Sequence, residues 1–109
     1  MLEALLGSTG RERVLVYLRA RNEGYAREMA RFFGTGVIQI QKQLERLEVA
    51  GILAARPAGR TRLYAFNPGY PFLRELTALL DKALQFYPPE QREALLMNRR
   101  RPRRKGKPL

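Results

Sequence analysis

A Gly-Thr-Gly turn at residues 34–36 lies between two short segments with the apolar spacing of a helix, and this arrangement constrains the fold most. Before the turn, residues 25–34 place four apolar side chains on one face: Ala26, Met29, Ala30 and Phe33. After it, residues 36–50 repeat the pattern at Ile40, Leu44, Leu47 and Ala50. Gly34 and Gly51 are suited to close these segments, because glycine readily adopts the left-handed conformation that ends a helix. The sequence therefore predicts two helices joined by a tight turn.

Residues 52–68 change character directly after the second helix. Two short runs, 52–56 and 61–66, flank a Pro-Ala-Gly-Arg stretch, and proline and glycine are turn-forming residues. The second run contains two aromatic residues, which favour strands. This pattern predicts a β-hairpin that follows the helix pair without a linker.

The remaining periodic segments predict helices on both sides of this unit. We expect a helical turn at 2–7, a helix at 9–21 after a Ser-Thr cap, and a long helix at 70–87 with proline at its start. A short final helix or linker follows at 88–98. The expected fold class is mainly α with a small β-hairpin (α+β): a helix-turn-helix with a hairpin and a C-terminal dimerisation helix. We expect one domain at 1–87, a short terminal helix or linker at 88–98, and a disordered basic tail at 99–109.

The charge of the chain predicts an anionic partner. The 109 residues carry a net charge of +11 with a sequence pI of about 11.1, which is most often the mark of a nucleic-acid-binding protein. Residues 99–109 hold seven cations and no acid, so residues 1–98 still carry +4. The expectation of nucleic-acid binding therefore does not depend on the tail alone.

The residue types that are missing exclude several classes of protein. The sequence contains no Cys and no His, which excludes disulfides, thiolate or imidazole metal sites and a histidine base. No phosphate loop or nucleophile elbow is present, and the acids form no obvious pair. We therefore predict no enzyme, no cofactor and no metal. The sequence also has no 18-residue apolar run and no signal peptide, which predicts no membrane partner and a cytoplasmic, nucleoid-associated protein.

The outward face of helix 36–50 has the character of a surface that reads DNA. If Ile40 faces the core, Lys42 and Arg46 point nearly opposite, while Gln41 and Gln43 lie on the flanks. Glutamine can bind adenine, and lysine or arginine can bind guanine or phosphate. The alternative is an amphipathic helix with a solvated polar face. The expected DNA-binding residues here are Thr35, Gly36, Ile38, Gln39, Lys42, Gln43 and Arg46.

Further cations are expected on the DNA backbone. On the hairpin they are Arg56, Arg60 and Arg62, although such charges also protect an edge strand from aggregation. Arg27 and Arg31 on helix 25–34 could contact phosphates or pair with Glu23 or Glu28. The tail could track the backbone or remain a solvated charge run that binds RNA nonspecifically. Its expected contacts are Arg99, Arg100, Arg101, Arg103 and Arg104.

The apolar arc of helix 70–87 is wider than one small domain can cover, which predicts a dimer interface. The alternative is a monomer in which residues 90–98 fold back over this helix. The expected interface residues are Leu5, Leu6, Phe72, Leu76, Leu79, Leu80, Ala83 and Phe86.

Three stretches, REMARFFG, IQKQLERLEVAGIL and RPAGRTRLYAFNP, make the chain resemble the winged helix-turn-helix of ArsR-like and MarR-like bacterial and archaeal transcriptional regulators. The resemblance covers residues 10–86 and implies a DNA-binding dimer, with helix 36–50 in the major groove and the hairpin on the backbone. Two features depart from the pattern. The turn holds two glycines and places Ile38 where a small hydroxyl residue is usual, and the Cys and His ligands of metal-sensing relatives are missing.

These observations together predict a sequence-specific, dimeric, DNA-binding transcriptional regulator of the repressor kind. One alternative is a nonspecific nucleic-acid-binding or chromatin-architectural protein, in which charge supplies nearly all the affinity. Another is a winged-helix module that binds a second protein.

Overall fold

The computed structural model describes residues 1–97, which form six helices and three strands. The expected α+β class is confirmed, and so is the order of the predicted elements. The elements are α1 (Glu3–Leu6), α2 (Thr9–Arg21), β1 (Glu23–Gly24), α3 (Ala26–Phe33), α4 (Val37–Val49), β2 (Leu53–Ala58), β3 (Thr61–Phe66), α5 (Leu73–Gln85) and α6 (Pro89–Leu96). The expected tail at 99–109 lies outside the described residues.

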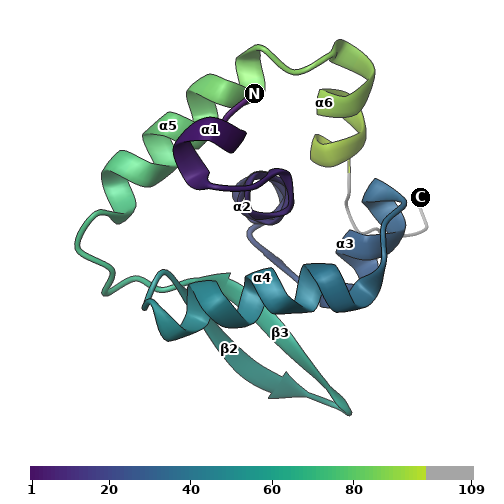
Figure 1. The fold of residues 1–109 in the computed structure, drawn as a ribbon, viewed down its shortest axis with the longest axis vertical. Coiled ribbons are helices and arrows are strands. Elements are labelled where there is room, and N and C mark those ends of the chain that lie inside the picture. Colours follow the sequence, from purple (N-terminus) through teal and green to yellow (C-terminus); the bar gives the residue numbers. More distant parts are fainter. Residues whose placement is uncertain (98–109) are drawn as a thin grey trace, which may run out of the picture.

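Helix α2 is the centre of the molecule, and the other helices surround it (Figure 1). Five consecutive residues, Val14 to Leu18, are buried, with at most 2% of each exposed. A helix that is apolar over most of its circumference requires neighbours on several sides. Here α3, α4, α5 and α6 supply those neighbours, so one core holds the whole described chain together.

The turn between α3 and α4 is closed by its glycines. Gly34 has a φ of 65°, the left-handed conformation in which glycine is favoured. The Thr35 amide then donates to the Ala30 carbonyl at 3.0 Å, which completes the end of α3. Helix α4 begins after Gly36 and buries Ile40, Leu44 and Leu47, as the period predicted. Ala50, the fourth residue of the predicted stripe, is exposed because it lies at the C-cap, where the helix ends.

Strands β2 and β3 form the predicted hairpin, in which Ala58 pairs with Thr61 around a two-residue turn. The sequence did not predict β1, which pairs antiparallel with β3 and gives the sheet order β1-β3-β2. A two-residue strand has no detectable alternation, and residues 23–24 lie just after the helix expected at 9–21. Gly24 is required there, since a Cβ would lie 2.8 Å from the Tyr17 ring.

Helix α6 anchors the end of the described chain to α2. Leu95 is fully buried, and Arg21 of α2 donates to the carbonyls of Ala94 at 3.0 Å and Leu95 at 3.1 Å. The Arg21 guanidinium also stacks on the Tyr17 ring, 4.6 Å from its centroid. The segment therefore packs on α2 and leaves part of α5 uncovered. Within residues 1–97, no helix is long and apolar enough to cross a membrane.

Candidate nucleic-acid interface

The outer surface of α4 carries the polar side chains that the sequence predicted. Gln39, Lys42 and Arg46 are exposed on the side opposite the buried Ile40. Within the described residues, neither Lys42 nor Arg46 belongs to an ion pair. Both cations are therefore available to an anionic partner.

Apolar and acidic side chains share this surface. Ile38 is 67% exposed and Val49 is 90% exposed, at opposite ends of α4. Glu48 is neutralised, because Arg62 of the hairpin donates to its carboxylate at 2.7 Å. Glu45 remains exposed toward the C-terminal half of the helix. The outward cations are thus Lys42 in the middle of α4 and Arg46 in its last turn, while amide and apolar side chains occupy the part nearest the turn.

The two flanks of α4 are held by neighbouring elements. On one side Arg11 of α2 donates through Nε to Gln43 Oε1 at 3.2 Å. On the other side Arg62 holds Glu48. In the turn, the Thr35 hydroxyl donates to Gln39 Oε1 at 3.2 Å. These contacts fix both the position of the helix and some of its polar side chains.

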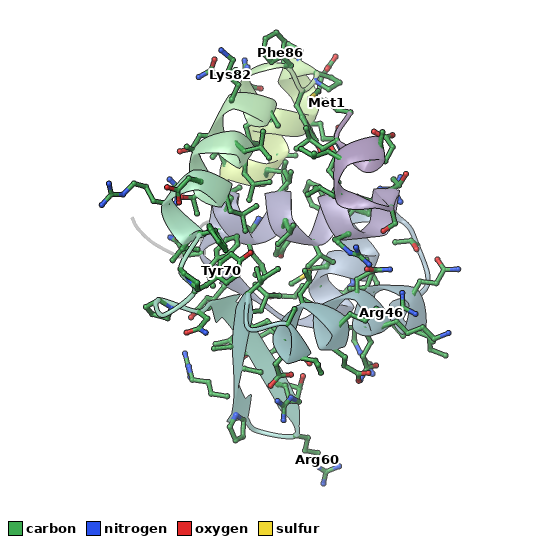
Figure 2. The ribbon with its side chains drawn as sticks, turned by 60° about the vertical axis from the view of Figure 1, so that its left-hand side comes forward. Met1, Arg46, Arg60, Tyr70, Lys82 and Phe86 are labelled. Carbon is green, nitrogen blue, oxygen red and sulfur yellow. The ribbon has the colours of Figure 1, made fainter. Side chains whose placement is uncertain are left out.

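The arginines of the hairpin have different surroundings. Arg60 lies at the tip, far from the body of the molecule (Figure 2), and forms no ion pair among residues 1–97. Arg56 lies 3.4 Å from Glu23 of β1. Arg62 pairs with Glu48 and lies over the Tyr64 ring at 6.0 Å, and its pKa is raised by these neighbours, Tyr64 first and Glu48 next. Arg60 is therefore the hairpin cation with the most freedom to reach a phosphate.

A groove of about 600 Å³ separates the hairpin from α3 and the start of α4. Among the described residues that line the groove, Glu28 is the one acid. Four arginines also line it: Arg27, Arg31, Arg60 and Arg62. Glu28 accepts a hydrogen bond from the Tyr25 amide at 3.0 Å, and Glu23 faces Arg56. Within residues 1–97, neither Arg27 nor Arg31 forms an ion pair with Glu23 or Glu28. The groove is therefore positively charged.

The structure thus brings most of the expected DNA-binding residues to one end of the molecule, across α4, the turn and the hairpin. The exceptions are the five tail arginines, which lie outside the described residues. Sequence reasoning did not assign Arg11 to this end, and it placed Gln41 on a flank of helix 36–50 without including it among the expected contacts. No local sequence pattern indicated a role for Arg11, because its hydrogen-bond partner Gln43 is 32 positions away in the chain.

The expected dimer interface needs a correction. Leu80 is fully buried and Ala83 is 4% exposed, because both pack inside one chain. Leu80 and Ala83 have no exposed surface with which to contact a partner chain, so they are not part of a dimer interface. Leu6 and Leu76 are partly buried against the same core. The exposed apolar surface that remains consists of Leu5, at 67%, Phe72, at 62%, and Phe86, at 67%, with the half-buried Leu79.

These apolar residues lie apart from the polar surface of α4. Phe72, Leu79 and Phe86 follow each other at seven-residue intervals and share one face of α5. Figure 2 shows Phe86 at the opposite end of the molecule from Arg60. A partner chain on α5 would therefore leave the cationic end accessible. Among the described residues, no group of three or more Asp, Glu, His or Cys side chains could hold a metal ion.

No family model matches the chain, and no curated protein matches it. Among solved structures, the chain is similar to the apo form of a double mutant of ZitR from Lactococcus lactis. The TM-score is 0.54 at 16% sequence identity, over 80% of this chain and 74% of that one. This likeness shows the fold, a winged helix. Membership of the ArsR-like or MarR-like group stays a prediction.

Proposed function

We propose that the protein is a dimeric, sequence-specific DNA-binding transcriptional regulator that represses by covering a promoter. The observation that supports this proposal most strongly is the outer surface of α4. There, Gln39, Lys42 and Arg46 are exposed together beside the basic hairpin. A helix of this kind fits the major groove, where amide and cationic side chains bind base edges and phosphates. ZitR is itself a winged-helix regulator, and the shared fold supports the proposal.

The roles divide between the elements. Helix α4 would enter the major groove and contact bases through Gln39, Lys42 and Arg46. Arg60 at the hairpin tip and the groove arginines of α3 would contact phosphates on both sides of it, which positions the protein without reading sequence. A second copy on the α5 surface would present a second α4, as a two-fold symmetric site requires. The protein would act at the nucleoid in the cytoplasm.

The division of roles predicts different effects for two substitutions on DNA affinity. Lys42→Ala should reduce discrimination between the preferred site and unrelated DNA by about 1–3 kcal/mol. Arg60→Ala should weaken all duplexes alike and flatten the log–log salt dependence by up to about 0.9. Fluorescence anisotropy with a preferred and a scrambled duplex, over a salt series, measures both quantities.

Lys82→Ala is the matched control for this experiment. It removes the same side chain and charge from the exposed face of α5, at the opposite end of the molecule from Arg60 (Figure 2). Its specificity and salt dependence should equal those of the unmodified protein. If Lys42→Ala weakens preferred and scrambled DNA equally, α4 does not read bases, and the architectural alternative is favoured.

A further inference from the structure

Arg11, in the first turn of α2, is held at two points. Its Nη1 donates to the Leu6 carbonyl at 2.8 Å, at the end of α1, and its Nε donates to Gln43 Oε1 at 3.2 Å. Both side chains are half-buried, so water competes for these hydrogen bonds less than it does on the open surface. The guanidinium therefore connects α1 to a side chain on the flank of α4.

This contact determines which way the Gln43 amide faces. A guanidinium carries only N–H donors, so only the amide oxygen can face Arg11. The amide NH₂ group must then take the other position, away from α2. Gly10 of α2 lies beside the Gln43 side chain, since a Cβ there would lie 3.4 Å from Gln43 Cγ. The side chain lies against the first turn of α2 with its oxygen already engaged.

We propose that Arg11 is a positioning residue that makes Gln43 a hydrogen-bond donor to the bases of DNA. This inference rests on the proposed function, in which α4 lies in the major groove. Guanine O6 and N7, thymine O4 and adenine N7 are acceptors there, whereas adenine N6 and cytosine N4 are donors. A glutamine that presents only NH₂ selects against cytosine, whose major-groove edge offers no acceptor, and favours the keto bases guanine and thymine.

The expected adenine contact of Gln43 changes accordingly. Glutamine binds adenine through its oxygen and nitrogen together, and Arg11 already engages that oxygen, which leaves only the NH₂ group to contact adenine N7. The bond from a charged guanidinium also polarises the amide, which strengthens NH₂ as a donor. Gln39 differs, because its neighbour is the Thr35 hydroxyl, which can donate or accept and so permits both amide orientations.

Selection from a randomised duplex library tests the inference with the full chain. The base pair whose preference disappears in Gln43→Ala is the one that residue 43 reads. For the unmodified protein we expect guanine or thymine there, about fivefold over cytosine, the size of one hydrogen bond. Arg11→Ala should reduce this ratio to below about twofold. Arg13→Ala, which removes the same charge from the same helix, should leave it unchanged.

A second variant does not depend on how well Arg11→Ala folds. Gln43→Glu keeps an oxygen for Arg11 but replaces the NH₂ donor with an acceptor, so the preference should invert toward cytosine or adenine. In the DNA-free protein, the Arg11 Nε–H resonance should shift in Gln43→Ala, as observed by NMR. An unmoved resonance overturns the inference, because the bond would then not exist.

The outcomes separate the inference from the proposed function. Cytosine enrichment at that position by the unmodified protein, or an unchanged keto preference in Arg11→Ala, overturns the inference and leaves sequence-specific binding in place. Failure of the unmodified protein to enrich any sequence removes the proposed function, and the inference with it.

Discussion

Glu12 on α2 is only 4% exposed, and its carboxylate connects three parts of the chain. It accepts hydrogen bonds from the Leu2 amide at 2.7 Å and the Tyr87 hydroxyl at 2.5 Å, and the Met1 amino group lies 3.3 Å away. Burial and the hydrogen bond to Glu12 raise the pKa of Tyr87, so its hydroxyl stays a donor over the physiological range. Glu12 thereby joins the start of the chain to the segment between α5 and α6.

We expect Glu12→Ala to lower the free energy of unfolding by roughly 2–4 kcal/mol, because it leaves two partly buried donors without their acceptor. Urea denaturation followed by circular dichroism measures the loss. Glu45→Ala, on the exposed face of α4, is the control and should change stability by at most about 0.5 kcal/mol. A loss for Glu12→Ala no larger than that of the control would show that the three contacts carry little stability.

Among the elements, α5 shows what sequence patterns can and cannot determine. Its wide apolar arc predicts more than one neighbour, and within residues 1–97 α5 packs mainly against α2, so the second neighbour stays a prediction. The pattern does not say which part of the arc the chain covers itself. The structure assigns Leu80 and Ala83 to the core and leaves Phe72 and Phe86 exposed. That division depends on how α2 lies against α5, which is a tertiary contact and has no local signal.

The exposed face of α5 predicts that the protein is a dimer. Sedimentation equilibrium at micromolar concentration should give twice the 12.6 kDa mass of the chain. Phe86→Asp should shift the mass to that of the monomer, because a charge buried in an apolar interface is desolvated without a partner. Val49→Asp, which places the same charge at an exposed valine of α4, is the control and should remain dimeric. A monomeric unmodified protein would remove α5 as the interface.

The helix-turn-helix was the part of the fold most accessible from sequence, since glycine positions and apolar spacing are local signals. The ends of α4 were predicted to within one residue at each end. Strand β1 was missed because its existence depends on pairing with β3, about forty residues later. The hydrogen bond from Arg11 to Gln43 was missed for the same reason. The sequence identified the outward-facing side chains of α4. It did not show which of these side chains already form hydrogen bonds with neighbouring elements.

At the scale of the whole molecule, the unpaired cation of the hairpin and the exposed aromatic end of α5 lie far apart. The cationic hairpin tip and the exposed Phe86 lie at opposite ends (Figure 2). This arrangement suits a protein that binds DNA with one end and a second copy of itself with the other. Charge alone would also produce affinity for any duplex, so affinity without a comparison does not test the proposal.

The most direct test is the ratio of two affinities at physiological salt: that for a duplex selected from a random library, and that for an unrelated duplex of equal length. We predict a ratio of at least about 10³, which is the range of specific DNA-binding proteins. Equal affinities would contradict the central claim and indicate an architectural protein. Failure to bind either duplex would also contradict it and point to a protein partner.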